Sequence, residues 1–192
     1  MRRGLPRLII VAVDQLPSWA VVSPKRLEHI QRVAALLDQW GAAMALPAAE
    51  GERWSRAGWL HDALRDAPQA ELKRLVPGCD WEEELLHGPA AANRADADAD
   101  AKAWRDPEVL LAVRWHSVGC AEWKMTGKAL YCADFLDPGR KFDRPVRAAL
   151  AKRFPKYPDA VFRDVVTRRV QWTERSGWPL LEPTRRLWSS LK

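Results

Sequence analysis

The stretch GWLHDALRD, residues 58–66, places a histidine directly before an aspartate among apolar residues. Its apolar spacing predicts the buried end of a helix that runs from about residue 50 to residue 64. A carboxylate taken out of water needs a partner, because an unpaired buried charge is very costly. Two partners suit Asp62: a hydrogen bond to His61 or a metal ion. The rest of the sequence decides between these two.

The composition is that of one globular domain. Of the 192 residues, 47% are hydrophobic and 29% charged, which suffices for a single buried core. The three cysteines, Cys79, Cys120 and Cys132, are too few and too irregularly spaced for a disulfide framework, so we expect reduced thiols. The apolar run at residues 8–13 imitates a signal peptide but lacks a convincing cleavage site. No segment approaches the roughly 18 apolar residues of a membrane span, and we expect a cytoplasmic protein without a membrane partner.

Nearly every periodic segment has helical spacing. Ser23 and Pro24 form a helix start, with serine as the N-cap and proline at the first helical position, and Gly41 is the expected stop. Asp106 and Pro107 repeat this start. Further helices are expected at residues 50–64, 69–75, 80–87, 127–136, 145–154, 159–172 and 182–191. No run of alternating polarity is long enough for a sheet, so the predicted fold class is all-α, a single-domain helical bundle.

Three compositional features have a structural interpretation. The segment ADADADA, residues 95–101, has no ligand geometry built in, and we expect a solvated loop. The eleven tryptophans mostly recur at helical spacing and are expected in the core, with base stacking left open for one or two. Residues 139–192 contain fourteen Lys or Arg against five Asp or Glu. This basic end is a solvated helical surface or a region that attracts phosphates.

The four histidines share one kind of sequence context. Each lies in a separate helical segment among apolar residues, and together they are His29, His61, His87 and His116. Asp134, between Ala133 and Phe135, is a second carboxylate in an apolar helix. A bundle brings such residues together in its interior. Four imidazoles and two carboxylates exceed the needs of one tetrahedral zinc ion but suit two octahedral ions, with Asp62 as the bridge.

The order of these residues resembles the HD superfamily of metal-dependent phosphohydrolases in its dinuclear form. Three segments sharpen the resemblance: LLHGP at 85–89, AVRWHSVG at 112–119 and ALYCADFLDPGR at 129–140. Together they resemble the YqeK-type branch, the symmetrical bis(5'-nucleosyl)-tetraphosphatases, which cleave diadenosine tetraphosphate into two ADP. The resemblance implies an HD-type bundle with a core at residues 23–144, an N-terminal extension at 1–22 and C-terminal helices at 145–192 that pack on the core.

The resemblance also implies a role for each ligand. One metal ion would be held by His29, His61, Asp62 and Asp134, and the second by His87, His116 and the bridging Asp62. The family favours iron. Chemistry alone indicates divalent or mixed-valent first-row metal ions, manganese included.

The expected reaction is attack by a hydroxide shared between the metal ions on the middle of the tetraphosphate bridge. Asp62 and Arg65 are the expected catalytic residues. Arg65, Lys128 and Arg140 are candidates to neutralise the phosphate oxygens of the substrate, with a surface salt bridge as the alternative for each. Arg65 stands where the family often has lysine, and Asp137 stands where it commonly has glutamate before Pro-Gly-Arg. The expected partner is a small dinucleoside polyphosphate, with a homodimer left open.

Three alternatives to this function stay open. The same fold could act on another nucleotide or a cyclic dinucleotide, because the ligands recognise phosphate and metal rather than a base. A metal-dependent oxygenase could use the same ligand set. A non-enzymatic basic protein could bind RNA through the arginines of FRDVVTRRVQW, residues 162–172. That last alternative leaves the placement of the histidines unexplained, so we do not expect a nucleic-acid partner.

Overall fold

Residues 15–98 and 104–192 are described by the structure, which is a computed structural model. The apolar run at residues 8–13 and residues 99–101 of the Ala-Asp segment lie outside the described residues. Within the described ranges the regular elements are helices and no β-strand occurs, which confirms the all-α prediction. None of these helices is long and apolar enough to cross a membrane.

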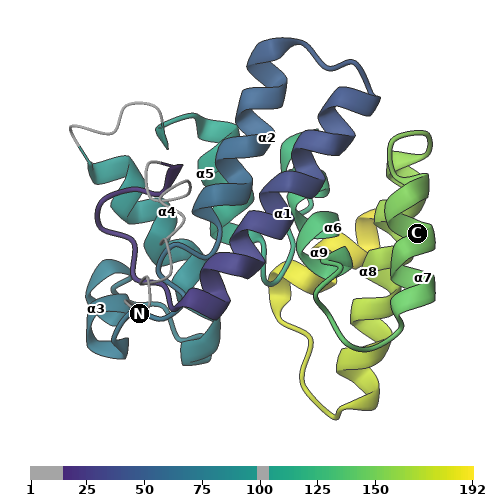
Figure 1. Ribbon diagram of the computed structural model, residues 1–192. Helices are drawn as coiled ribbons and strands as arrows, with labels where there is room; N and C mark the ends of the chain where they lie inside the picture. Colours follow the sequence, from purple (N-terminus) through teal and green to yellow (C-terminus); the bar gives the residue numbers. More distant parts are fainter. Residues whose placement is uncertain (1–14, 99–103) are drawn as a thin grey trace, which may run out of the picture.

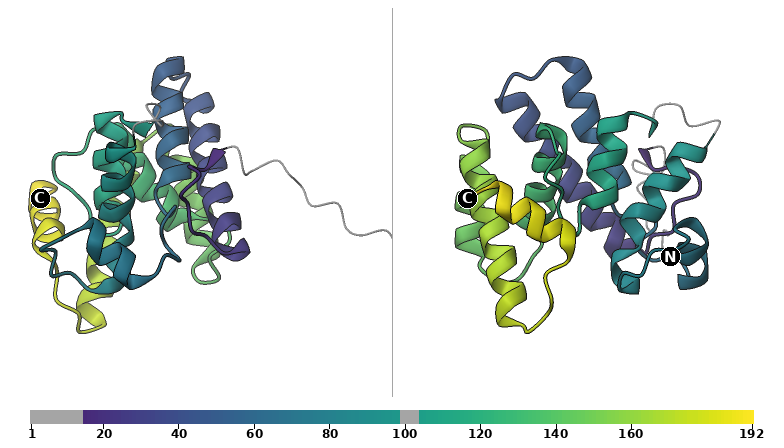
Figure 2. Two further views of the ribbon diagram at one scale, coloured as in Figure 1. Left: turned by 90° about the vertical axis from the view of Figure 1, so that its left-hand side faces the viewer. Right: turned by 180° about the vertical axis from the view of Figure 1, so that it is seen from behind.

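The helices form two groups around a central pair. In chain order the elements are α1 (Pro24–Ala43), α2 (Ala48–Leu60), α3 (Gln69–Leu75), the 3-10 helix η2 (Glu83–Leu85), α4 (His87–Ala97), α5 (Pro107–Trp115), α6 (Met125–Leu136), α7 (Arg144–Arg153), α8 (Pro158–Arg175) and α9 (Glu182–Ser190). Figure 1 shows α1 and α2 side by side, with α3, α4 and α5 towards one side of the molecule. Figure 2 shows from behind that α7, α8 and α9 lie on the opposite side.

Both predicted helix starts are confirmed by their caps. The Ser23 hydroxyl accepts a hydrogen bond from the backbone N–H of Arg26 at 3.3 Å. The Asp106 carboxylate accepts from the N–H groups of Glu108 and Val109, at 2.9 and 3.3 Å. These bonds satisfy donors that the first turn of a helix cannot pair within itself.

The predicted stop at Gly41 is wrong, because α1 continues through this buried glycine to Ala43. The N–H of Met44 still donates to the carbonyl of Trp40 at 2.9 Å, so the helical bonding persists past the glycine. The chain turns only at Ala45, which has a positive φ of 50°. A glycine ends a helix when it adopts the left-handed conformation, and here Ala45 adopts it instead.

Two other predicted helices are corrected. The helix expected to continue to residue 64 ends at Leu60, and His61 and Asp62 lie in the turn that follows. The helix expected at residues 80–87 is absent: a short 3-10 turn occupies residues 83–85 and α4 begins at His87. Helix α4 then runs to Ala97, so the first residues of the predicted Ala-Asp loop are helical.

A close approach of α1 and α2 brings the first two predicted ligand segments together. A Cβ atom at Gly58 would lie 2.9 Å from the Cα of Ala34 and 2.9 Å from a methyl of Leu37. Glycine is therefore the residue that permits this helix spacing. Since Gly58 lies three residues before His61, the contact sets the distance of His61 from α1.

The tryptophans only partly fill the core. Trp54 is fully buried, and Trp40 stacks on Phe154, the residue after α7, with the ring centroids 3.9 Å apart. By contrast, Trp172 and Trp178 are 61% and 59% exposed. Helices α7 and α8 pack against α6, and α9 packs against α8, so the chain after residue 144 covers one side of α6.

Candidate metal centre

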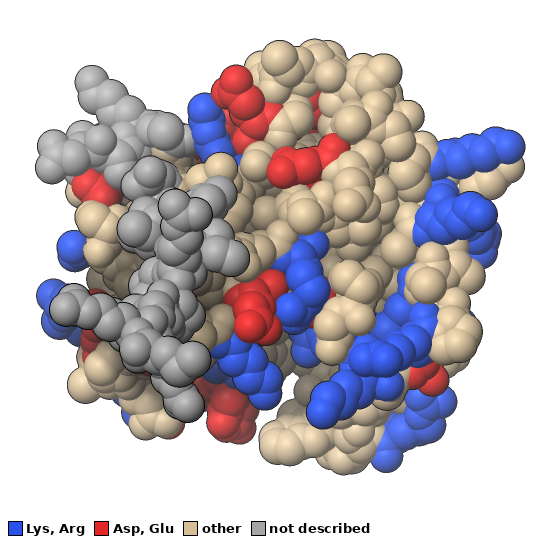
Figure 3. All heavy atoms as spheres, in the orientation of Figure 1, with Lys and Arg blue, Asp and Glu red and all other residues tan. Residues whose placement is uncertain are grey.

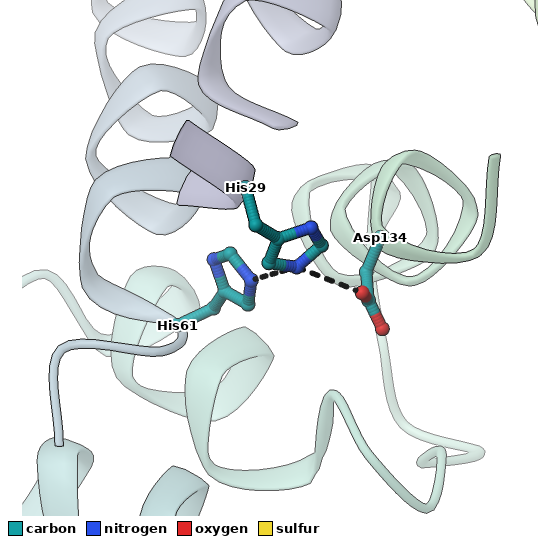
Figure 4. Close-up of side chains that lie close together, drawn as sticks. All are labelled: His29, His61 and Asp134. Atoms are coloured by element: carbon teal, nitrogen blue, oxygen red, sulfur yellow. Dashed lines mark hydrogen bonds and ion pairs between the residues drawn. The ribbon is translucent and has the colours of Figure 1, made fainter. Parts of the chain in front are cut away.

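The six predicted ligands converge inside the bundle from five different helices or helix ends. They are His29 on α1, His61 and Asp62 after α2, His87 at the start of α4, His116 after α5 and Asp134 on α6, and each is at most 9% exposed. Two groups could each hold a metal ion: His29, His61 and Asp134, and Asp62, His87 and His116. Figure 4 shows the first group, with both imidazoles and the carboxylate turned towards one another.

The turn after α2 allows two neighbouring residues to face the same centre. Side chains at adjacent helical positions do not face the same way. Backbone hydrogen bonds hold the turn in place, because the N–H of Val21 donates to Ala63 at 2.7 Å and the N–H of Asp66 donates to Val21 at 3.3 Å. As a result His61 and Asp62 are both buried and both directed at the other ligands.

Asp62 presents one carboxylate oxygen to each histidine pair. Its Oδ2 lies 3.6 Å from the Nε2 atoms of both His29 and His61. Its Oδ1 lies 3.1 Å from the Nε2 of His87 and 3.5 Å from that of His116. This is the arrangement expected of a carboxylate that bridges two ions.

All four imidazoles use Nδ1 for a hydrogen bond and direct Nε2 to the centre. The Nδ1 atoms of His61, His87 and His116 lie 2.7, 2.8 and 2.7 Å from the carbonyl oxygens of Gly58, Glu84 and Val113. Since a carbonyl can only accept, these three Nδ1 atoms carry the proton. The neutral ring then offers an Nε2 lone pair, which is the form that ligates metals.

The Nε2 atoms face each other in pairs, 3.3 Å apart for His29 and His61 and 3.1 Å apart for His87 and His116. Two neutral rings protonated on Nδ1 cannot hydrogen-bond to each other through Nε2, whereas a cation between them could bind both lone pairs of the His87–His116 pair. The donor set therefore fits a metal ion. It does not fit a His61–Asp62 hydrogen bond, which was the alternative that the sequence left open.

Burial and the neighbouring side chains together set the pKa values of the residues at this centre. Burial lowers the pKa of His61 to about 4 and also lowers the pKa of His87, which favours their neutral forms. Burial alone would raise the pKa of Asp62, but its interactions with His61, His116 and His87 hold that pKa well below its usual range. An ionised carboxylate and neutral imidazoles are the protonation states that bind metals.

His29 differs from the other histidines because two carboxylates contact it. Burial pushes the pKa of His29 down, but its bonds to Asp134 and Asp137 outweigh burial and raise the pKa to about 9. Its Nε2 lies 3.2 Å from Asp134, and its Nδ1 lies 2.8 Å from Asp137.

Asp137 orients His29, a role that the sequence did not indicate. The carboxylate is 2% exposed and also accepts from the Arg32 Nε at 2.7 Å and from the N–H of Gly139 at 2.9 Å. A carboxylate behind a ligating imidazole fixes the ring and raises its basicity. The sequence analysis noted Asp137 only as the residue that replaces the family's usual glutamate, directly after the helix expected at 127–136, and α6 does end at Leu136.

The predicted phosphate-binding residues have different positions. Arg140 reaches the centre, where its Nη2 donates to Asp134 Oδ1 at 2.8 Å. Arg65 lies on the turn three residues after Asp62, half-buried, and its charge contributes to the lowered pKa of His87. Lys128 is not brought to the centre, because its Nζ donates to Asp159 on α8 at 2.8 Å.

Two further arginines contact the ligand carboxylates. The Arg26 Nη1 lies 2.6 Å from Asp62 Oδ2, and the Arg169 Nη1 lies 3.7 Å from Asp134 Oδ2. Arg26 precedes His29 by three residues, so helical spacing could have placed it on the ligand face. Arg169 belongs to the segment considered for RNA binding, but it points inwards and donates to the carbonyl of Ser117 at 2.8 Å.

Three curated proteins named bis(5'-nucleosyl)-tetraphosphatase, symmetrical, are similar in sequence. That of Bacillus subtilis (strain 168) is 27% identical over 101 residues, 49% of this chain and 53% of that protein. That of Staphylococcus aureus (strain NCTC 8325 / PS 47) is 31% identical over 91 residues, 44% of this chain and 45% of that protein. That of Halalkalibacterium halodurans is 24% identical over 130 residues, 64% of this chain and 68% of that protein. The chain thus spans about half the length of the first two relatives.

A solved structure shares the whole fold. The crystal structure of a predicted HD superfamily hydrolase involved in NAD metabolism from Clostridium acetobutylicum superposes with a TM-score of 0.74 at 20% identity. The superposition covers 88% of this chain and 90% of that one. At 20% identity, the structural similarity establishes the fold and nothing about the activity.

The family model of the HD domain matches residues 26–138, which contain all six predicted ligands. This match extends over more than half of the 192 residues. The chain therefore belongs to the HD domain family.

Proposed function

We propose that the chain is a dinuclear metal-dependent phosphohydrolase that cleaves diadenosine tetraphosphate symmetrically into two ADP. The observation that carries the proposal is the position of Asp62, with one carboxylate oxygen towards each pair of histidine Nε2 atoms. The names of the three curated relatives supply the substrate. Two first-row metal ions held this way would supply an activated water and neutralise charge on phosphate oxygens.

The residues of the chain divide the work around that chemistry. In the proposal His29, His61 and Asp134 hold one ion, His87 and His116 hold the other, and Asp62 bridges both. Asp137 keeps the Nε2 of His29 directed at the centre through its bond to Nδ1. The described ligands are imidazole nitrogens and carboxylate oxygens, which suit iron or manganese, and we propose iron.

Arginines surround the ligand carboxylates and would receive the phosphates of the substrate. Arg140 contacts Asp134, Arg26 contacts Asp62, and Arg65 lies close enough to affect His87. A planar guanidinium can bind two phosphate oxygens at once, so it can also stabilise the charge that grows on them during cleavage. Since Lys128 pairs with Asp159, these arginines are better placed than Lys128 for that role.

Product analysis tests the proposal directly. Purified protein loaded with ferrous or manganous ion is incubated with diadenosine tetraphosphate, and the nucleotides are separated by chromatography. ADP as the sole product supports symmetrical cleavage. AMP plus ATP keeps the hydrolase but contradicts the point of attack. No turnover by protein shown to hold two metal ions contradicts the proposed substrate and favours another nucleotide or a cyclic dinucleotide.

The variant Asp62→Asn tests the role of the bridge. It keeps the shape of the side chain but removes its charge, so we expect the chain to lose at least one metal ion and about a hundredfold or more of its turnover. Asp80→Asn removes an exposed carboxylate and serves as the control. Asp62→Asn protein that retains two metal ions and full turnover would contradict the scheme.

A further inference from the structure

Two arginine side chains contact Asp134, and a third lies in the same electrostatic environment. Arg140, after α6, and Arg169, on α8, contact its two carboxylate oxygens at 2.8 and 3.7 Å. Arg147, on α7, lies close enough that the charges of Asp134, Arg140 and Arg169 all affect its pKa. Figure 3 shows Lys and Arg side chains gathered over the α7 and α8 side of the molecule.

Arg147 is the unusual member of this group because it is buried. Its side chain is only 4% exposed, and its guanidinium carbon lies 4.1 Å from the ring centroid of Phe135 and 4.2 Å from that of Phe142. Contact with two aromatic rings restricts the orientation of the guanidinium.

Two of the three guanidinium nitrogens of Arg147 lack acceptors among the residues that the structure describes. In the described part of the chain, the buried side-chain nitrogen or oxygen atoms without a hydrogen-bond partner are Nε and Nη1 of Arg147 and Nε of Arg140. Buried polar groups are nearly always paired, and a charged donor left unpaired is especially costly. Three such donors on two neighbouring cationic side chains indicate an acceptor that comes from outside the chain.

The local charge points to an anion. Arg140, Arg147 and Arg169 carry three positive charges, against the negative charges of Asp134 and of Asp143, which also affects Arg147. In the proposed function Asp134 is a metal ligand, so its charge is shared with a cation and neutralises the arginines less. Burial lowers the pKa of Arg147, and the neighbouring Arg140 lowers it further, which a bound anion would reverse.

We propose that Arg147 and Arg140 together bind a phosphate group beside Asp134, so that Arg147 is a substrate-binding residue. The fixed fork of Arg147 and the free Nε of Arg140 offer N–H donors to the oxygens of one phosphate. This proposal rests on the proposed function for the identity of the ligand, a phosphoanhydride whose other phosphates lie at the metal centre. A tetraphosphate bridge is long enough to place a phosphate beyond the metal centre, and Arg147 receives that group.

Anion binding to metal-loaded protein tests this without relying on turnover. Pyrophosphate and ADP are titrated calorimetrically into full-length, manganese-loaded wild type, Arg147→Met, Arg147→Lys and Lys152→Met. Lys152 is an exposed cation on the same helix and serves as the control for charge alone. We expect Arg147→Met to weaken both ligands about tenfold or more, because two charge-assisted hydrogen bonds are lost, and Lys152→Met to change them less than about twofold.

Arg147→Lys keeps the charge and the aliphatic stem but lacks the planar fork, and a clear loss of affinity is expected there too. If Arg147→Met does not fold, this variant carries the test. Wild-type affinity in either folded variant, or an equal loss in Lys152→Met, would overturn the proposal. A crystal structure of the wild type with pyrophosphate provides a second measurement: an anion oxygen bonded to Arg147 supports the proposal, and pyrophosphate bound without contact to Arg147 overturns it.

The two proposals fail separately. If pyrophosphate affinity depends on Arg147 but diadenosine tetraphosphate is not cleaved, the substrate is wrong and the anion site stands. If ADP is the product but the KM for diadenosine tetraphosphate and the pyrophosphate affinity are unchanged in Arg147→Met, the anion site is wrong and the proposed function stands.

Discussion

The substitution Gly58→Ala tests whether helix spacing builds the first histidine pair. A Cβ atom at this position would lie 2.9 Å from the Cα of Ala34 and 2.9 Å from Leu37. Carbon atoms in contact prefer about 3.5–4.0 Å, so α1 and α2 must separate by roughly half an ångström or more. Because His61 follows Gly58 by one helical turn, the separation also moves its Nε2 away from that of His29.

The expected magnitude is the balance of two terms. Overpacking a core contact costs about 1–3 kcal/mol, whereas replacing glycine by alanine within a helix gains about 1 kcal/mol. The net destabilisation is therefore up to about 2 kcal/mol. For a chain of this length, that upper value lowers Tm by about 4–8 °C. Disturbing the position of one ligand should also weaken manganese binding by about tenfold or more.

Gly51 provides a matched control on the same helix. A Cβ atom there would meet nothing within 4 Å. Gly51→Ala should therefore show only the helix-propensity gain, a rise in Tm of about 2–4 °C, with unchanged metal affinity. Thermal unfolding and manganese titration of both variants separate the two cases. If Gly58→Ala raised Tm as Gly51→Ala does and bound manganese like the wild type, the argument from helix spacing would be refuted.

Two further predictions concern His29. Asp137→Asn removes the charged acceptor behind the imidazole and should lower metal affinity by about 10–100-fold, measured as metal retained after dialysis; wild-type retention would show that Asp137 has no orienting role. Without metal, the carboxylates raise the pKa of His29 to about 9, so the stability that its charge contributes is present below pH 6.5 and is lost as the pH rises towards 9. Metal binding near pH 7 should then release about one proton, and affinity should rise with pH up to about 9. Calorimetry in two buffers of different ionisation enthalpy measures this release, and the absence of any buffer dependence would contradict the prediction.

The sequence was sufficient to predict which residues converge at the candidate centre but not the backbone that carries two of them. His61 and Asp62 continue an apolar helical pattern, which predicted a helix to residue 64, whereas α2 ends at Leu60. The end is set by long-range contacts, namely the backbone bonds of Val21 to this turn and the bond from the N–H of Ser23 to Asp66 at 2.7 Å. Periodicity within one segment contains no information about such partners.

The misplaced helix at residues 80–87 has a local cause. Gly88 and Pro89 directly follow the predicted end at His87, and they lie in the first turn of α4. Proline is tolerated there because the first N–H groups of a helix have no intrahelical partner. His87 thus begins α4, and its Nδ1 bonds back to the carbonyl of Glu84 at 2.8 Å.

The same construction builds both histidine pairs. A Cβ atom at Gly88 would lie 2.8 Å from the carbonyl oxygen of Val113, the atom that accepts the bond from Nδ1 of His116, so glycine permits the approach of α4 and α5 as Gly58 permits that of α1 and α2. The centre therefore depends on two close helix contacts joined by Asp62. His87 begins α4 and His116 follows α5, whereas the connection between the two helices joins their opposite ends. That connection leaves α4 after Ala97, about 16 Å along the helix from His87. A change in the length of that connection should therefore leave the contact at Gly88, and with it the approach of His87 to His116, untouched.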